Sequence, residues 1–249
     1  MDTSTARVAR KVCENSEITS LFIEGFGESF RSRRAGQFLT LKIMQEGQWS
    51  KPHPFTISCA PEDPQLRVTI KKIGAFTSLI TTMEEGDPVI VSGPYGKFCQ
   101  DIDALPEILL VAGGVGITPF LSVLRHFRGI RSQSRVVLMW SNRSMDDAFA
   151  VDELADMTRE IPLKVVHCLS REKPGADLSA HVRGDYPEVY FDTGRLTRDV
   201  IRKYLPPADP AVFLCGPPPM QEYILREVEA LGMDPAAVLK ESFTWQGAR

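Results

Sequence analysis

Residues Ile108–Leu124 read ILLVAGGVGITPFLSVL. An apolar run rich in Ile, Leu and Val leads into Gly113, Gly114 and Gly116, and apolar residues then recur at helical spacing. This pattern predicts a buried parallel strand, a tight turn and a helix.

The predicted helix has a recognisable start. Thr118 stands at the expected N-cap and Pro119 at the first helical position, where a missing N–H is tolerated. Free N–H groups at such a start suit the pyrophosphate of a dinucleotide. The spacing GGxGxxP differs from GxGxxG, however, and a glycine turn that binds no ligand fits the same residues. Both interpretations stay open on this segment alone.

Length and composition narrow the class of protein. The 249 residues suffice for two ordinary domains, and 43% hydrophobic with 24% charged residues is typical of a soluble globular protein. A net charge of −3 offers no electrostatic case for nucleic acid. The longest apolar runs are too short to span a bilayer, and the N-terminal residues lack an apolar signal core. We therefore expect a cytoplasmic protein, or one at the cytoplasmic face of a membrane complex whose anchor lies in another segment or subunit.

Neither cysteines nor histidines form a recognisable metal-binding pattern. The five cysteines are scattered with no CxxC pair, and the four histidines show no ligand spacing. We therefore expect no disulfide framework, no iron–sulfur cluster and no metal site.

The first half of the chain has a β-like pattern from Arg7 to about Phe98. Short apolar or alternating segments are separated by Gly, Pro, Asp and Glu, which predicts a small antiparallel barrel. The predicted strands are Ile18–Ile23, Gln37–Ile43, Phe55–Cys59, Leu66–Ile70 and Pro88–Ser92, and one short helix is predicted to start at Thr77.

The segment KPHPFTISCAP, residues 51–61, carries a polar, aromatic and hydroxyl series at a strand start. His53 would face an anionic group, Phe55 would pack against a flat ring, and the Thr56 hydroxyl would bond a ring nitrogen. An edge strand opened by Pro54 explains the same residues without a ligand.

Five motifs, in this order, resemble those of the ferredoxin–NADP reductase superfamily. They are HPFTIS, KKIGAFT, GPYGKF, AGGVGITPF and FLCGPPPM, and they look most like the dehydrogenase domain of the NADPH oxidase and ferric reductase branch. The resemblance covers nearly the whole chain. We expect an N-terminal antiparallel six-stranded β-barrel that binds FAD, residues 1–101, and a C-terminal Rossmann-like parallel sheet that binds NAD(P), residues 102–249.

For the FAD half, the resemblance implies a role for each residue of two motifs. His53 would contact the phosphate region, Phe55 would lie against the isoalloxazine, and Thr56 would bond flavin N5; Pro54 belongs to the same FAD-binding segment. In the second motif the implied cofactor-binding residues are Lys71, Gly74, Phe76 and Thr77, where a helix start receives the pyrophosphate. Thr77 also fits an ordinary N-cap.

After Phe98 the pattern changes to strands that alternate with helices. The predicted strands are Ile108–Ala112, Val136–Trp140, Leu163–Leu169 and Ala211–Cys215; the predicted helices are Phe120–Arg128, Ala148–Glu160, Arg198–Tyr204 and Pro219–Leu231. Ligands of such a sheet bind beyond the carboxyl ends of its strands.

Arginines follow several of these strand ends, where an NAD-specific site usually has an acid. The residues expected to bind the nucleotide there are Asn142, Arg143, Ser170, Arg171 and Arg195. Because the guanidinium fork suits a 2′-phosphate, we expect NADPH in preference to NADH, although a loop arginine can also be merely solvated.

The resemblance places Cys215, with Gly216 and Pro217, beside the nicotinamide. Cys215 is also explained as a small buried hydrophobe. Glu241 is implied as the acid near the nicotinamide and Phe243 as the ring that shields the flavin, with Trp245 as a competing candidate. We expect Thr56, Cys215 and Glu241 to serve catalysis.

The predicted function is hydride transfer from NADPH to FAD N5, followed by single-electron delivery to a separate acceptor. The acceptor would be a redox protein, a haem domain, ferric iron, a quinone or oxygen. The alternatives are an electron-transfer subunit of the dihydroorotate dehydrogenase type and a non-catalytic flavin- or nucleotide-binding regulatory module.

Overall fold

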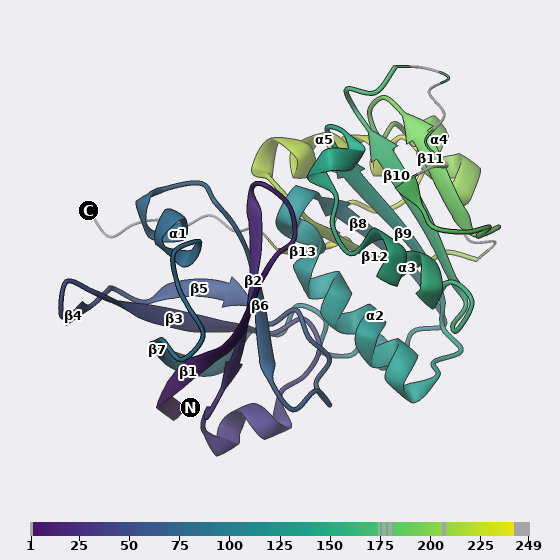
Figure 1. Ribbon diagram of the computed structural model, residues 1–249. Coiled ribbons are helices and arrows are strands. Elements are labelled where there is room, and N and C mark those ends of the chain that lie inside the picture. Colours follow the sequence, from purple (N-terminus) through teal and green to yellow (C-terminus); the bar gives the residue numbers. More distant parts are fainter. Residues whose placement is uncertain (1, 174, 176–177, 179–180, 206–207, 242–249) are drawn as a thin grey trace. The chain divides into compact units, whose positions relative to one another are not determined.

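The computed structural model describes residues 2–173, 175, 178, 181–205 and 208–241. By its contacts the chain divides into two compact units, each built around one sheet (Figure 1). Of the described residues, the first unit holds those up to Gln100 together with Thr118–Gly129, and the second holds Asp101–Ile117 and residues 130–241.

The first unit is the predicted antiparallel barrel. Strand β3 pairs with β7, β7 with β1, β1 with β2, β2 with β6, and β5 with β3. A bridge between Ile57 and Val68 joins the end of β5 to β6 and completes the six-stranded ring. The strands are β1 (Asp2–Cys13), β2 (Ile18–Glu24), β3 (Phe38–Gln45), β5 (His53–Thr56), β6 (Leu66–Lys71) and β7 (Pro88–Tyr95), and the two-residue β4 (Gln48–Trp49) extends β3 as a hairpin.

Two details of the barrel differ from the prediction. The pattern did not single out β1, and β5 ends at Thr56, whereas Phe55–Cys59 was predicted. The end of β5 has a physical cause, because the chain crosses there from one neighbour to another. Ile57 N–H donates to Gln37 O at 2.9 Å, and Ser58 N–H then donates to Arg67 O at 2.8 Å.

Helix α2 (Thr118–Ile130) is held to the turn between β5 and β6 by three polar side chains on one face. Ser122 Oγ donates to Cys59 O at 2.7 Å, Arg125 donates to Ser58 O, and His126 bonds Glu62 at 2.7 Å. This spacing of three and four residues places the side chains on one helix face, so α2 groups with the first unit.

The second unit is a parallel sheet in the order β11-β10-β9-β8-β12-β13. Its strands are β8 (Glu107–Gly113), β9 (Arg135–Asn142), β10 (Leu163–Leu169), β11 (Val189–Thr193), β12 (Ala211–Cys215) and β13 (Leu239–Glu241). Every residue of β8 is buried, as its continuous apolar run predicts for a parallel strand covered on both faces. Strands β10 and β12 have the predicted bounds, whereas β11 and β13 were not predicted.

Short helices connect these elements: α1 (Ala75–Ile80), α3 (Val151–Met157), α4 (Arg198–Tyr204), α5 (Pro218–Glu229), and the 3₁₀ turns η1 (Glu28–Ser32), η2 (Ile102–Ala104), η3 (Gly114–Ile117) and η4 (Met145–Asp147). Helix α4 has the predicted bounds. Helix α3 begins later than the predicted Ala148, because Ala150 adopts a left-handed conformation with φ of +54° that no helix can include.

None of the helices in the described part of the chain is both long and apolar enough to cross a membrane.

Candidate functional site

Three aromatic rings lie parallel at the start of β5. The His53 ring stacks on Phe76 of α1 with 3.7 Å between ring centroids, and Phe55 lies 6.0 Å from the same Phe76 ring at an interplanar angle of 17°. Burial lowers the pKa of His53. The structure therefore brings together residues from two of the predicted FAD motifs, although they are far apart in the sequence, and it gives His53 an aromatic neighbour.

Thr56 ends β5 with its side chain buried. The Thr56 hydroxyl has no hydrogen-bond partner among the described residues, although a buried hydroxyl without a partner is costly. A cofactor atom that accepts or donates at Thr56 would remove that cost. Thr56 therefore fits the predicted contact with a flavin ring atom.

The loop before α1 corrects one expectation. The helix begins at Ala75 with Gly74 as its N-cap, so the prediction that it starts at Thr77 is wrong. Thr77 lies three residues inside, and its Oγ1 accepts the N–H groups of Ile73 and Gly74 at 2.8 and 2.9 Å. This arrangement is a capping box, in which the threonine at the third helical position bonds the N-cap backbone and so fixes the loop before α1.

Lys71, the other predicted residue of this motif, is the last residue of β6. Its ammonium forms an ion pair with Glu17 at 2.9 Å, and about a third of its side chain is exposed. The structure thus gives Lys71 a partner within the barrel.

The glycine turn after β8 is built for close contact between backbones. A Cβ on Gly116 would lie 2.4 Å from the Cys215 carbonyl oxygen, and one on Gly113 would lie 2.3 Å from Met220 Sδ. A Cβ on Gly216 would lie 3.2 Å from the Gly113 Cα. Two turns, one after β8 and one after β12, therefore touch at positions where only glycine fits.

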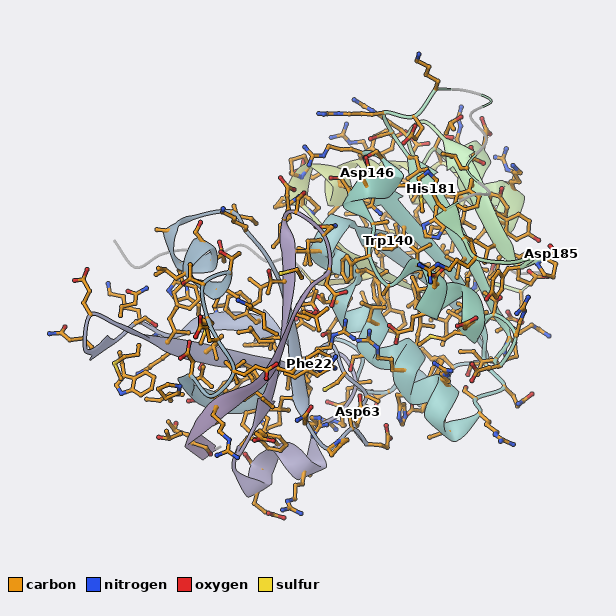
Figure 2. The ribbon with its side chains drawn as sticks, in the orientation of Figure 1. Phe22, Asp63, Trp140, Asp146, His181 and Asp185 are labelled. Atoms are coloured by element: carbon orange, nitrogen blue, oxygen red, sulfur yellow. The ribbon has the colours of Figure 1, made fainter. Side chains whose placement is uncertain are left out.

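The same turn needs glycine for a second reason. Gly114 has φ of +54°, which disfavours other residues, and nothing lies within 4 Å of its Cβ position. Trp140 of β9 holds the turn, because its indole Nε1 donates to Gly114 O at 2.9 Å. Figure 2 shows Trp140 among the strands of this sheet.

Helix α2 begins one residue earlier than expected. The turn η3 leads directly into Thr118, which is the first helical residue, so the expectation that Thr118 is the N-cap is wrong. Pro119 accordingly lies at the second position of the helix. The physical reason is that the glycine turn already coils, so no extended residue separates it from the helix.

Loops after neighbouring strands bring the predicted nucleotide residues to one edge of the sheet. Ser170 N–H donates to Asn142 O at 3.0 Å, and Arg171 N–H donates to Arg143 O at 2.8 Å. Gly194 N–H donates to Leu169 O at 2.8 Å, which sets the loop of Arg195 beside the end of β10. The three arginines that the sequence singled out are exposed.

Arg143 has a carboxylate partner that was not predicted. Its Nε and Nη2 donate to the two oxygens of Asp147 at 3.1 and 3.2 Å, and about half of the Arg143 side chain is exposed. This is a bidentate guanidinium–carboxylate pair, and arginine binds phosphate with the same geometry. Any anion that binds Arg143 here must compete with Asp147.

Cys215 and Glu241 end adjacent parallel strands and stand opposite each other in the register of β12 and β13. Cys215 is fully buried. Burial raises the pKa of the Glu241 carboxyl to about 7, and its Oε2 has no hydrogen-bond partner in the described part of the chain. Phe243 and Trp245, the two candidates for the ring that shields the flavin, lie outside the described residues.

The two halves match different family models. A model described as "FAD-binding domain" matches residues 14–98, and one described as "Oxidoreductase NAD-binding domain" matches residues 110–226. The chain thus joins an FAD-binding domain to an oxidoreductase NAD-binding domain. The orphaned Thr56 hydroxyl of the first domain is compatible with a flavin contact, and the open Cβ position of Gly114 in the second is compatible with close approach of a dinucleotide.

Relatives of this chain include larger proteins. The chain is 30% identical over 218 residues to a flavohemoprotein of Deinococcus radiodurans. The aligned region covers 85% of this chain and 52% of that protein. It is 31% identical over 217 residues to a propane 2-monooxygenase reductase component of Mycolicibacterium goodii, with 85% of this chain and 59% of that protein covered. The chain thus spans little more than half the length of both.

A solved structure shares the fold. A ferredoxin NADP+ reductase from Neisseria gonorrhoeae, with bound FAD and NADP, superposes with a TM-score of 0.79 at 17% identity over 98% of this chain and 100% of that one.

Three side chains that shape the candidate site were not predicted. Trp140 supports the glycine turn, Asp147 holds Arg143, and Gln221 bonds both Gly216 and the Glu241 backbone. Two had a signal in the sequence: Asp147 follows Arg143 at helical spacing, and Gln221 directly follows FLCGPPPM.

Proposed function

We propose that this chain takes electrons from NADPH, passes them through FAD, and delivers them singly to a separate acceptor protein or domain. The observation that carries the proposal is the match of an FAD-binding and an NAD-binding family model to one chain, in that order. FAD, when bound, supplies the conversion from a two-electron hydride donor to one-electron transfer. We assign FAD to residues 1–101 and the nucleotide to residues 102–249.

The barrel residues would bind and orient the flavin. Thr56 would hydrogen-bond a flavin ring nitrogen and so satisfy its buried hydroxyl. Phe55 would pack against the flavin ring, and His53 with Pro54 would lie at the phosphates, where Phe76 keeps the His53 ring in place by stacking.

The sheet residues would bind the nucleotide. Gly114, whose Cβ position is open, would let the pyrophosphate approach the backbone closely, and Gly113 and Gly116 would pack this turn against the turn after β12. Arg143 would bind the 2′-phosphate, and Ser170, Arg171 and Arg195 stand at the same strand-end edge. This arrangement of arginines supports NADPH over NADH, and Asp147 sets a limit on that preference.

The kinds of relative that the chain resembles indicate which class of acceptor to expect. Flavohemoproteins and a monooxygenase reductase component are among them, which favours a haem domain or an oxygenase component over a small acceptor. The NADPH oxidase and ferric reductase branch, which the motifs resemble, would likewise use a haem or ferric acceptor.

The test is anaerobic reduction of the FAD-loaded protein by NADPH and by NADH, followed by a panel of acceptors. We expect bleaching of the flavin absorbance by NADPH at lower concentrations than by NADH. Reoxidation should be faster with cytochrome c, a haem protein, than with quinone. A protein that binds FAD but is not reduced by either nucleotide contradicts the proposal and favours a regulatory module.

The Thr56 hydroxyl offers a sharper test. We expect Thr56→Ala to retain FAD but to slow flavin reduction by about tenfold, because a lost hydrogen bond to a bound group is worth about 1.4 kcal/mol. Stopped-flow absorbance measures the rate. Thr40→Ala, on the neighbouring strand β3, is the matched control and should leave the rate unchanged; equal rates for Thr56→Ala and the unaltered protein would remove Thr56 from the flavin site.

A further inference from the structure

Gln221 is a buried amide in the first turn of α5, with 8% of its surface exposed. Its Nε2 donates two hydrogen bonds, to Gly216 O at 2.9 Å and to Glu241 O at 2.7 Å. Both N–H groups of the amide are therefore used, and each binds the backbone of a different segment.

The two segments that Gln221 joins carry Cys215 and Glu241. Gly216 directly follows Cys215, and Glu241 is the last residue of β13. Strand β13 has three residues and pairs with β12 at three positions, Phe213 with Leu239, Leu214 with Lys240, and Cys215 with Glu241. Because so short a strand has few contacts with β12, the hydrogen bond from Gln221 to the end of β13 contributes much to holding β13 in place.

The environment of Glu241 depends on where β13 lies. Its carboxyl is largely buried, and Oε2 has no hydrogen-bond partner among the described residues. Desolvation raises the pKa of this carboxyl, and a carboxyl that moved outward into water would lose this effect.

We propose that Gln221 is a positioning residue that holds Glu241 opposite Cys215 at the nicotinamide end of the nucleotide site. The placement at the nicotinamide rests on the proposed function. The tether itself rests on the two hydrogen bonds of the Gln221 amide. The amide is suited to this task because it donates twice to carbonyl oxygens without bringing a charge beside a buried carboxyl. Gln221 thereby keeps Glu241 in the desolvated position that raises the pKa of its carboxyl.

The test is Gln221→Met, which keeps the length of the side chain and its helix propensity but removes both donors. Glu222→Met is the matched control, because Glu222 is the next residue of α5 and is exposed. Protein labelled with ¹³C at the glutamate carboxyls is titrated by NMR without nucleotide, and the Glu241 signal is assigned from Glu241→Gln.

We expect the midpoint of the Glu241 titration to fall from about 7 by at least about one pH unit in Gln221→Met and to stay in place in Glu222→Met. The pH dependence of anaerobic flavin reduction should shift in the same direction. An unchanged Glu241 midpoint in folded Gln221→Met overturns the tether. A shifted midpoint with an unchanged pH dependence of reduction overturns the placement at the nicotinamide.

A second variant covers the case in which Gln221→Met does not fold. Gln221→Asn keeps the amide on a shorter side chain and should lower the midpoint by a smaller amount; no change in it counts against the tether. Failure of the proposed function would instead appear as unaltered protein that is not reduced by NADPH, a result that leaves the carboxyl titration readable.

Discussion

The two units of this chain present their candidate cofactor-binding groups in different ways. In the barrel the candidate groups are side chains on one short strand, the rings of His53 and Phe55 and the hydroxyl of Thr56. In the parallel sheet they are turns of bare backbone at the strand ends, where Gly113 and Gly116 leave no room for a Cβ.

This difference follows from the type of sheet. An antiparallel strand alternates its side chains between two faces, so single side chains can be directed at a ligand. The carboxyl ends of parallel strands share one edge, where turns and helix starts offer N–H groups instead. We therefore expect the barrel site to tolerate side-chain changes with loss of rate, and the sheet site to lose stability when a single carbon is added.

The largest expected effect is that of Gly116→Ala. The new Cβ would meet the Cys215 carbonyl oxygen at 2.4 Å, and this backbone atom cannot swing away. We expect a loss of about 3 kcal/mol in the free energy of unfolding, at the upper end for overpacking, together with weaker nucleotide binding. Urea unfolding and NADPH titration measure the two.

Two other glycines serve as controls for Gly116→Ala. Gly113→Ala would meet side chains, Met220 Sδ at 2.3 Å and Pro217 Cδ at 3.0 Å, and should cost less because the Met220 side chain can move. Gly129→Ala meets nothing within 4 Å in helix α2, so it should stabilise by about 0.5 to 1 kcal/mol. Equal stability of all three variants would contradict the expectation that an added carbon destabilises the glycine turn after β8.

A smaller effect is expected from the buried histidine of the sheet. His167 is fully buried, stacks on Phe191 with 5.3 Å between centroids, and also faces Trp140. Burial, and then the charge of His181, lower the pKa of His167 from 6.5 to about 4. Between these two values the unfolded chain binds a proton that the folded chain does not, so stability falls as the pH falls below 6.5.

Because of this histidine, we expect the free energy of unfolding to fall by about 2 kcal/mol between pH 7 and pH 5, since one pKa unit corresponds to about 1.4 kcal/mol. His167→Phe should remove that part of the pH dependence in urea unfolding. His53→Phe is the control in the barrel and should alter it far less, because His53 is only half-buried. The expectation fails if His167→Phe and the unaltered protein lose the same stability over this range.

The smallest expected effect concerns the exposed edge of the sheet. Arg143→Ala should raise the KM for NADPH about tenfold and that for NADH less than about twofold, because only NADPH carries the 2′-phosphate. Asp147→Asn should lower the KM for NADPH by about two- to threefold by freeing the guanidinium, since exposed ion pairs are weak. Steady-state kinetics with both nucleotides measure these ratios, and equal changes for both would exclude Arg143 from the 2′-phosphate site.

Local pattern was sufficient for the strongly periodic elements. Strands β10 and β12 and helix α4 have the predicted bounds, and the buried run of β8 leads into the predicted glycine turn. Element starts at special backbone positions were less predictable. Gly74 caps α1 where Thr77 was expected to begin it, and Ala150 delays α3, because both depend on local dihedral angles that residue type does not specify.

Strands β11 and β13 show a further limit of local pattern. Neither was predicted, and β13 has only three residues, two of them exposed. Such short segments become strands because a neighbouring strand offers free backbone groups along its edge. That neighbour is supplied by a part of the chain distant in sequence.

The amino-acid sequence by itself determined the two-part architecture, the glycine turn and the polar residues at the strand ends, because these follow from periodicity and from residue types with special backbone freedom. Only the tertiary structure decided which distant residues meet: Trp140 with Gly114, and Gln221 with the backbone of Glu241. The physical reason is that hydrogen bonding and burial depend on distances between segments far apart in the chain, and these distances exist only once the sheet has formed.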